Sequence, residues 1–399
     1  MDGTGFMATE TLGENASVVP MPSLGDQVKL FVPWWKFSRE LKRLWQQLRA
    51  IPEFFIEPYR QRRHDAERQS NLTQTSGVIP MGSRMALFLI YQPDKLADST
   101  IWTCEHLVSK GYGLLVVSNH RLHRKDLERL VQVSSLVIER PNFGYDFGGY
   151  RDGIWVLQQK EVAIQHLLII NDSIWFPLQS SETLISNMEH SEAGLVGALQ
   201  LDPLRQSDNL PKSKRPFLGS FLLMVNRSAW VHPAFKRFWE TYRITSNKYK
   251  TIRRGERGFT HAMLDSSIAC EAIYTRSMLD AYVQSLRNQD LYQLLTTLVA
   301  VDRNIKRDID EALATFSEAP VWRTNALKIA TAATEKQNIL ATAPITSLIH
   351  FQVPYLKKSA DIHNLAALAF IQKRIVDGNI PAAHESIMKE VAALLERKA

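Results

Sequence analysis

The feature of this sequence that most limits its fold is a regular alternation of short apolar runs with helical patterns. The apolar runs are MALFLIY (residues 85–91), GLLVVS (113–118), SLVIE (135–139) and HLLII (166–170). The segments between them, residues 99–110, 124–131 and 150–160, have helical spacing. Continuous apolar strands separated by helices are typical of a parallel sheet covered on both faces. We therefore expect an α/β, Rossmann-like nucleotide-binding domain over residues 84–275.

The segments on either side of this domain have different patterns. Residues 1–26 are small and polar, which predicts a disordered tail. Residues 27–83 are predicted to form a basic helical arm followed by a linker, because residues 69–84 have linker composition. Beyond the domain the apolar strands stop and helical patterns continue. We expect residues 276–399 to form a helical C-terminal region.

The basic arm contains a predicted amphipathic helix over residues 33–51. Between Lys29 and Arg68 there are ten Lys or Arg and five Asp or Glu, so this segment supplies five of the seven net positive charges. The helix can pack against protein, which is the commonest outcome, or lie on an anionic membrane surface. Nucleic-acid binding is a third reading, but no stacking or groove-reading motif supports it. We expect no nucleic-acid partner.

The composition also indicates a cellular compartment. The two cysteines, Cys104 and Cys270, have neither metal-ligand nor redox-pair spacing, and few cysteines are typical of a reducing compartment. The N-terminal residues lack the charged and apolar regions of a secretory signal. No window approaches the about 18 to 20 apolar residues of a membrane span. We expect a cytoplasmic protein, or one held peripherally on the inner face of the cell membrane.

A glycine-rich segment, RPNFGYDFGGYRDG (residues 140–153), lies between the third predicted strand and the next helix. Glycines let the backbone turn tightly and approach a ligand, and the amide groups of the helix N-terminus favour anions. In open parallel sheets, ligands bind beyond the carboxyl ends of the strands. The segment is therefore a candidate for binding a nucleotide diphosphate, through Arg140, Asn142, Gly144, Asp146 and Gly148. The alternative is a tight turn that binds nothing.

Asp172 directly follows the fourth predicted strand, between Asn171 and Ser173, at the same edge of the sheet. A hard cation such as Mg²⁺ or Mn²⁺ takes one or two protein carboxylates and fills its other positions with water and substrate phosphate. Asp172 can thus hold a divalent metal against a diphosphate leaving group. The alternative is a helix cap. Tyr91 and Asn119, which follow the first two strands, are placed to contact a base or ribose, or simply form turns.

Several of these segments together resemble one protein family, the rhamnan synthesis protein F family of bacterial polysaccharide glycosyltransferases. The similar segments are NFGYDFGGYRDG, LLIINDSIWFPL and GSFL (residues 219–222), with Phe235, Phe238 and Trp239 after them. Their order and spacing agree over about residues 85–275. Residues 252–260 (IRRGERGFT) and 353–358 (VPYLKK) are similar to two further family segments. The N-terminal arm lies outside the resemblance.

The resemblance implies a GT-A-like fold and a role for several residues. Asn142 and Gly144 would face the nucleotide, and residues 171–173 would stand where the metal-binding Asp-x-Asp signature usually lies. This triplet holds only one acid, and GSFL replaces the more frequent Gln-Ser-Tyr-Phe. An inverting transfer needs a base for the acceptor hydroxyl. We predict Glu256 as that base, in a loop between Gly255 and Gly258, because the similar family segment carries a Glu. A solvated partner for neighbouring arginines is its alternative, and Asp146 is the second candidate base.

These observations predict a glycosyltransferase acting in cell-surface polysaccharide synthesis. It would move a sugar, such as rhamnose or another deoxyhexose, from a nucleotide-diphosphate donor to a polysaccharide or lipid-linked oligosaccharide. Asp172 would bind the metal and Glu256 would act as base. A different class stays open, a non-catalytic scaffold that keeps the fold and organises a membrane-bound assembly through its basic arm. The single acid in the triplet is the feature that favours this alternative.

Overall fold

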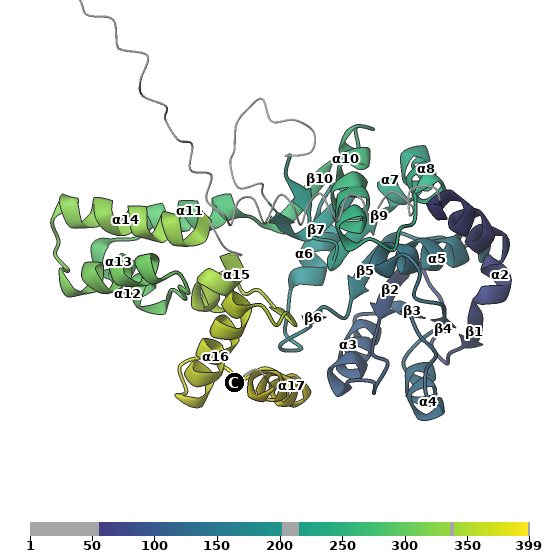
Figure 1. Cartoon of the computed structure of the whole chain (residues 1–399), viewed down its shortest axis with the longest axis horizontal. Coiled ribbons are helices and arrows are strands. Elements are labelled where there is room, and N and C mark those ends of the chain that lie inside the picture. The colour runs from purple at the N-terminus through teal and green to yellow at the C-terminus, as the bar shows by residue number, and fades with distance from the viewer. Residues whose placement is uncertain (1–55, 202–214, 336–338, 398–399) are drawn as a thin grey trace, which may run out of the picture. The chain divides into compact units, whose positions relative to one another are not determined.

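The computed structural model of this chain describes residues 56–201, 215–335 and 339–397 (Figure 1). One compact unit begins at Ile56. The predicted tail (residues 1–26) and the predicted helix over residues 33–51 lie outside the described residues. No helix in the described part of the chain is both long enough and apolar enough to cross a membrane.

The four predicted apolar runs form the centre of one sheet. They are β2 (Arg84–Ile90), β3 (Gly113–Ser118), β4 (Leu136–Glu139) and β5 (His166–Asn171). These strands pair in parallel in the order β4-β3-β2-β5. Each strand end lies within one residue of its predicted position. The expected α/β fold class is therefore confirmed.

The whole sheet is mixed, whereas a parallel sheet was expected. Antiparallel pairing joins β1 (Thr73–Ser76) to β4, and β9 (Leu222–Asn226) to both β5 and β7 (Leu195–Leu201). On β7, β8 (Phe217–Leu218) is antiparallel and β10 (Cys270–Tyr274) is parallel. A short apolar run does not indicate whether a strand is parallel or antiparallel to its neighbours, because this depends on the connections between the strands. The parallel arrangement is confined to β2–β5 and the β7–β10 pair.

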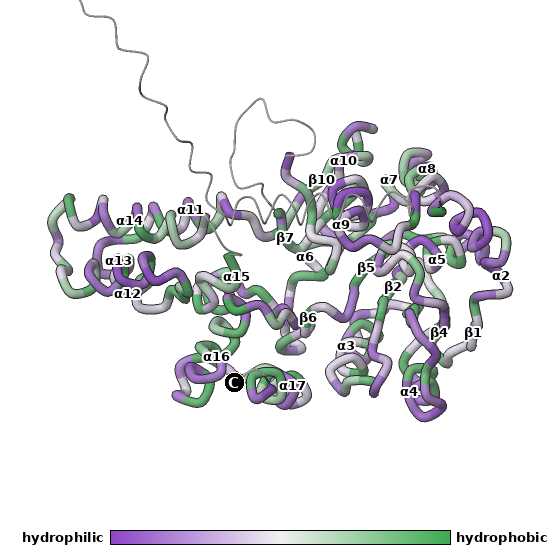
Figure 2. Tube along the Cα trace, viewed as in Figure 1, coloured by the Kyte–Doolittle hydropathy of each residue, from purple (hydrophilic) through white to green (hydrophobic). Residues whose placement is uncertain are grey.

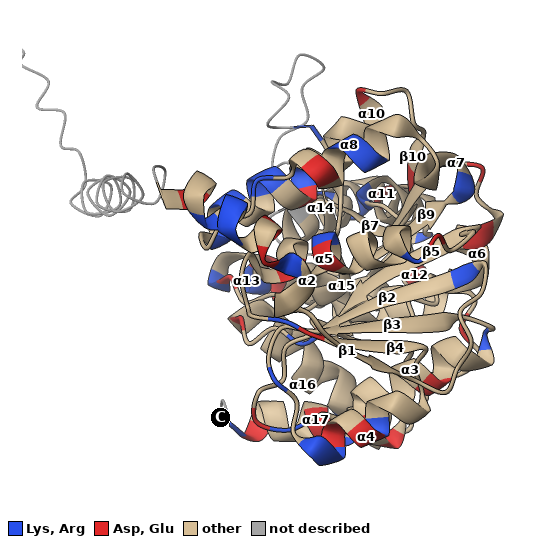
Figure 3. Ribbon diagram, turned by 90° about the vertical axis from the view of Figure 1, so that its right-hand side faces the viewer, with Lys and Arg blue, Asp and Glu red and all other residues tan. Residues whose placement is uncertain are grey.

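The sheet has a hydrophobic core on each face. Alternate residues of β2 point to opposite faces, so that Ala86 and Phe88 enter one core while Met85 and Leu87 enter the other. Buried residues of α3 (Asp98–Ser109), α4 (Arg124–Gln132) and α6 (Leu184–His190) belong to the first core. The second core includes α5 (Tyr145–Gln159), α8 (Pro233–Thr241) and α10 (Gly258–Leu264). Figure 3 shows β3 without charged residues and the charges gathered on surrounding helices.

Residues 56–83, expected to be arm and linker, are part of the compact unit. Residues 56–66 are helical, α2 (Arg68–Asn71) follows, and the polar segment TQTS forms β1. Buried charges fix these helices to α5, because the Asp152 carboxylate lies 3.2 Å from His64 Nε2 and 3.3 Å from Arg68 Nε. Linker composition could not reveal this packing, since β1 is short and its side chains are polar.

The C-terminal region is helical in the part that is described, apart from β11 (Leu356–Lys357). Its helices are α11 (Arg276–Ser285), α12 (Asn288–Thr297), α13 (Arg303–Ala314), α14 (Pro320–Glu335), α15 (Ile339–Thr342), the π-helix η3 (Thr346–His350), α16 (Ile362–Val376) and α17 (Glu385–Glu396). Figure 2 shows hydrophilic and hydrophobic stretches alternating along α13 and α14, as expected for helices with one buried face. β11 pairs antiparallel with β6 (Ile174–Trp175). This pairing brings the C-terminal region to the strand end that carries Asp172.

Candidate active site

The carboxyl ends of the parallel strands meet at one edge of the sheet, as the sequence predicted. Backbone hydrogen bonds cross from strand to strand there. Asp172 N donates to Leu89 O at 3.0 Å, and Arg140 N donates to Ser118 O at 2.9 Å. The residues predicted after β2, β3, β4 and β5 therefore lie at a common edge.

The glycine-rich segment is mostly helix rather than loop. α5 begins at Tyr145, five residues before its predicted start at residue 150. Gly144 precedes it with a φ of 85°, and a Cβ there would lie 2.3 Å from Ile244 Cγ2, so only glycine fits. A Cβ on Gly148 would lie 2.1 Å from Phe143 O. Glycines disfavour helices by propensity, but here close packing requires them. Gly148 is buried and packs against the preceding backbone.

Two residues that the sequence predicted to contact the nucleotide, Arg140 and Asn119, form hydrogen bonds within the protein instead. Arg140 is buried, and its guanidinium donates to Asp152 Oδ2 at 2.7 Å and to Phe143 O at 2.7 Å. It also donates to Asn119 Oδ1 at 2.5 Å, while Asn119 Nδ2 donates to Tyr145 O at 3.4 Å. Arg140 and Asn119 therefore brace the start of α5. Asn142, by contrast, is exposed to solvent.

Asn171 joins the strand end after β5 to the first turn of α5. Its Nδ2 donates to Asp146 Oδ2 at 3.2 Å. Its Oδ1 accepts from Ser173 N at 3.1 Å and from Ser173 Oγ at 2.6 Å. The two segments that the sequence singled out are thus in direct contact, although 25 positions separate Asp146 from Asn171.

Asp172 is oriented by the residues that follow β2. Its Oδ2 accepts from Tyr91 N at 2.8 Å and from Gln92 Nε2 at 3.1 Å. Burial nevertheless raises the pKa of Asp172 above its ordinary value, although these hydrogen bonds and the charge of Lys358 oppose the shift. Tyr91 contributes its backbone amide, and its side chain is 50% exposed at the same edge.

Glu256 lies in a π-helix, η2 (Ile252–Arg257), between α9 (Lys248–Thr251) and α10, and not in the loop that its flanking glycines predicted. Gly255 lets η2 approach α5, since a Cβ there would lie 2.5 Å from the Phe147 ring. Ser220 Oγ donates to Glu256 Oε1 at 2.8 Å. Burial raises the pKa of Glu256, against the effects of this hydrogen bond and of the Lys357 charge. π-Helical turns are frequent at functional sites.

The helix over residues 56–66 is hydrogen-bonded to the segment that carries Glu256. Glu57 accepts hydrogen bonds from Thr245 Oγ1 at 2.6 Å, Lys250 Nζ at 2.9 Å and Arg254 Nη1 at 3.0 Å. Burial alone would raise the pKa of Glu57, but these three donors outweigh it and hold the pKa below the ordinary value. Residues just before and within η2 are therefore fixed to the start of the compact unit.

Asp146 interacts electrostatically with two other carboxyls, those of Asp172 and Glu256, and we call these three residues the carboxyl cluster. Burial, followed by the charges of Asp172 and Glu256, raises the pKa of Asp146 to about 6. Asp146 is still open to solvent, so protein surrounds the carboxyl without sealing it. Lys357 arrives on β11, and burial lowers its pKa to about 7 against the opposing charges of Glu256 and Asp146. Shifted ionisable groups gathered at one place are typical of functional sites.

Sequence reasoning missed Lys357 and Ser220 as members of this group. Both lie in segments that resemble the family, VPYLKK and GSFL, which was the only signal available. Their proximity to Glu256 depends on long-range pairing of β11 with β6 and of β9 with β5.

Asp146 and Asp172 are the candidate ligands for a divalent metal. The described residues contain no set of three or more His, Cys, Asp or Glu that could hold an ion by themselves. Asp146 and Asp172 repel each other electrostatically, as the raised pKa of Asp146 records. A divalent cation would relieve this repulsion while taking its remaining ligands from phosphate and water. The two carboxyls therefore fit a metal that is bound jointly with a phosphorylated ligand.

The raised pKa of Asp146, which burial and then the neighbouring carboxyls cause, gives a stability prediction for Asp146→Asn. The folded protein keeps the Asp146 proton up to about pH 6, whereas the ordinary pKa is 3.8. Stability therefore falls as pH rises between these values and the loss is constant above them. Asn has no charge, so we expect a higher Tm than the wild type at about pH 8 and an equal Tm at about pH 4. Thermal unfolding at both pH values measures this.

The matched control for this measurement is Asp310→Asn, since Asp310 is exposed on α13. Its Tm should differ from the wild type by the same small amount at both pH values. A Tm gain for Asp146→Asn that did not depend on pH would contradict the assignment.

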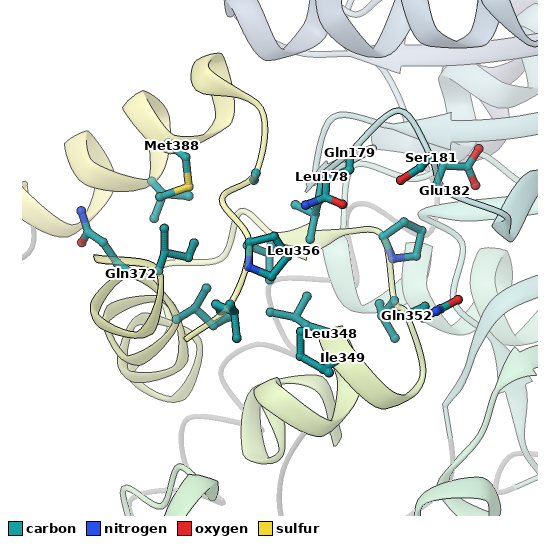
Figure 4. A pocket seen from close by; sticks show the side chains of 18 of the residues that line it. Leu178, Gln179, Ser181, Glu182, Leu348, Ile349, Gln352, Leu356, Gln372 and Met388 are labelled. Atoms are coloured by element: carbon teal, nitrogen blue, oxygen red, sulfur yellow. The ribbon is translucent and has the colours of Figure 1, made fainter. Parts of the chain in front are cut away.

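A separate cavity of about 300 Å³ lies behind β11. Figure 4 shows Leu178 and Leu356 beside it, with Gln372 of α16 and Met388 of α17 on another side. This cavity is not lined by any of the three carboxyl residues or by Lys357 or Ser220. The chemistry suggested above is therefore located on the other side of the strand.

Comparison with known proteins gives one family match. The family model described as "Rhamnan synthesis protein F" matches residues 114–302. This confirms the resemblance seen in the sequence. A protein from Sinorhizobium fredii named y4gN is 33% identical over 221 residues, which are 55% of this chain and 56% of that protein. The match thus spans about half the length of this relative.

Solved glycosyltransferase structures align with the chain at low TM-scores. The mannosyltransferase PcManGT from Pyrobaculum calidifontis, solved with GDP-Man and Mn²⁺, is 13% identical, with 88% of this chain and 89% of that chain covered and a TM-score of 0.27. TarS from S. aureus, solved with UDP, is 11% identical, with 79% and 88% covered and a TM-score of 0.29. GlyE from Streptococcus pneumoniae is 9% identical, with 47% and 45% covered and a TM-score of 0.27.

Proposed function

We propose, from the match of residues 114–302 to the rhamnan synthesis protein F family model, that the chain is a glycosyltransferase of cell-surface polysaccharide synthesis. It transfers a sugar from a nucleotide-diphosphate donor to a polysaccharide or lipid-linked oligosaccharide. The family description supports rhamnose, or another deoxyhexose, as the sugar. The observation that carries the proposal is the convergence of Asp146, Asp172 and Glu256 where α5 begins.

The donor diphosphate binds at the N-terminus of α5. Free backbone amides and the helix dipole favour an anion at this position. Asn142, which is exposed, faces the nucleotide, Gly144 shapes the turn that precedes α5, and the exposed ring of Tyr91 is available to the base. Asn171 orients Asp146 by donating a hydrogen bond to it, and Ser173 in turn donates a hydrogen bond to Asn171.

Asp172 and Asp146 would hold a divalent metal, Mg²⁺ or Mn²⁺, together with the donor. Bound there, it would supply positive charge against the departing diphosphate. The electrostatics of the site support this role, because three carboxyls gathered at one place would otherwise repel a phosphorylated ligand. Hydrogen bonds from Tyr91 N and Gln92 Nε2 keep the Asp172 carboxylate in position.

Glu256 accepts the proton of the acceptor hydroxyl. The acceptor oxygen then bonds to the anomeric carbon, the bond from that carbon to the diphosphate oxygen breaks, and its electron pair leaves with the diphosphate. Ser220 orients Glu256 Oε1. A raised pKa makes this carboxylate a better base than a solvated glutamate. Asp146 is the second candidate base, because the proposal assigns its carboxylate to the metal.

The location of the enzyme follows from its acceptor. We place it in the cytoplasm, peripherally on the inner face of the membrane, where a lipid-linked acceptor is accessible. The basic segment over residues 33–51 supports this placement, because anionic headgroups attract such segments.

A panel of nucleotide sugars tests the proposal. The full chain is mixed with each donor in the presence and absence of Mn²⁺, and both Tm and nucleoside-diphosphate release are measured. One donor should raise Tm by binding to the folded state, more strongly with Mn²⁺, and should be turned over. Stabilisation and release that are absent for every donor would contradict the proposal and favour the scaffold alternative.

A further inference from the structure

Lys357 lies near the carboxyls of Glu256 and Asp146, although it belongs to a segment far from both in the sequence. We call residues 353–358 the strap. In the strap, Lys357 pairs with Ile174 and Leu356 pairs with Trp175, two and three residues after Asp172. Adjacent residues of a strand point to opposite faces. Leu356 lines the cavity behind the strap (Figure 4), while Lys357 Nζ lies 3.3 Å from the centre of the Phe221 ring.

The two lysines of the strap have different surroundings. Lys358 Nζ donates to Ser99 Oγ at 3.1 Å and to Glu390 Oε2 at 3.4 Å, so its charge is partnered by protein. Lys357 Nζ has no hydrogen bond or ion pair to any residue within the described ranges; its contacts are the Phe221 ring and the charges of Glu256 and Asp146. Lys357 is half-buried, so its ammonium loses part of its water without gaining a hydrogen bond, and a cation–π contact repays only part of that cost.

We propose that Lys357 binds the terminal phosphate of the donor's diphosphate, the group that departs when the sugar is transferred. This inference rests on the proposed function. An ammonium group binds phosphate as a point charge with three donors, and those donors are the hydrogen bonds that Lys357 lacks. Its nearness to both Glu256 and Asp146 places it beside the base and the first turn of α5.

A diphosphate would also stabilise the charge of this lysine. Burial lowers the pKa of Lys357, although the charges of Glu256 and Asp146 oppose the shift. A neighbouring phosphate anion favours the protonated form. The strap thus supplies a cation to the leaving group, and the C-terminal region completes a site otherwise built from the sheet edge.

Binding of a nucleoside diphosphate and of the matching monophosphate to the full chain tests this inference. Lys357→Met should weaken diphosphate binding by about 10- to 100-fold, the range for a hydrogen bond to a charged group. Monophosphate binding should change less than about twofold, because the terminal phosphate is missing. Lys357→Arg should restore most of the diphosphate affinity. The Tm should not fall, since Met replaces a half-buried ammonium that has no hydrogen bond to the described residues, and keeps an apolar contact with the Phe221 ring.

Lys389→Met is the matched control, because Lys389 is exposed on α17 and pairs with Glu385. It should bind both nucleotides as the wild type does. If Lys357→Met weakens the binding of both nucleotides equally, or of neither, the role of Lys357 is overturned. Turnover by the wild type would then still support the proposed function. If the wild type neither binds nor turns over any nucleotide sugar, both proposals fail.

Discussion

Asp172→Asn is expected to lower turnover of the preferred nucleotide sugar by about 100- to 1000-fold, the usual effect of removing one electrostatic contact to a developing charge. The Asn oxygen can still accept the hydrogen bonds from Tyr91 N and Gln92 Nε2, so the local structure should persist. What is lost is the negative charge that holds the divalent cation. The variant should therefore also lose the Mn²⁺-dependent part of the Tm increase caused by the donor.

The stability of Asp172→Asn separates a lost function from a damaged fold. Burial raises the pKa of Asp172, so its charged form destabilises the folded state and a neutral side chain should not lower Tm. Asp377→Asn, at an exposed position after α16, serves as the control and should retain turnover. Turnover of Asp172→Asn within tenfold of the wild type, with its metal response intact, would rule out Asp172 as a metal ligand.

Glu256→Gln is expected to lower kcat by about 100- to 10,000-fold, the contribution of a positioned general base. Donor binding should persist, because the Gln oxygen can accept the hydrogen bond from Ser220 Oγ that now goes to Glu256 Oε1. The predicted result is a large loss in kcat with little change in donor affinity. Steady-state kinetics and equilibrium donor binding measure the two quantities separately.

The pH dependence gives an independent test of Glu256. A protonated carboxyl cannot accept the acceptor proton, so kcat/KM should fall as pH drops through the raised pKa of Glu256. This decline should occur at higher pH than the ordinary value of 4.5 allows. Ser220→Ala removes a hydrogen bond that lowers the pKa, so the decline should move to still higher pH. If Glu256→Gln stayed active, Asp146 would be the next base to test.

Much of the sheet and of its functional edge follows from local sequence pattern. Residues 85–91 and 113–118 are apolar enough to be buried on both faces, and this requirement fixes them as central strands. Because parallel strands end at one edge, the position of Asp172 next to the glycine-rich segment could also be predicted, and the Asn171–Asp146 hydrogen bond agrees with it.

Other features depend on contacts between segments that are distant in sequence. α5 includes glycines that propensity would exclude, because Gly148 and Gly149 pack closely against the Phe143 backbone and the Leu89 side chain. The mixed direction of the sheet and the placement of β1 likewise depend on pairing partners, which a short strand does not specify.

The sequence by itself determined the α/β class, the family resemblance and the edge that carries Asp146 and Asp172. Only the tertiary structure decided that Lys357 joins them, that Ser220 orients Glu256, and that residues 56–83 are built into the compact unit. The physical reason is that periodicity reports how one segment is buried. The position of the Lys357 ammonium, the π-helix η2 and the charge network of Asp152 arise only where several segments pack together.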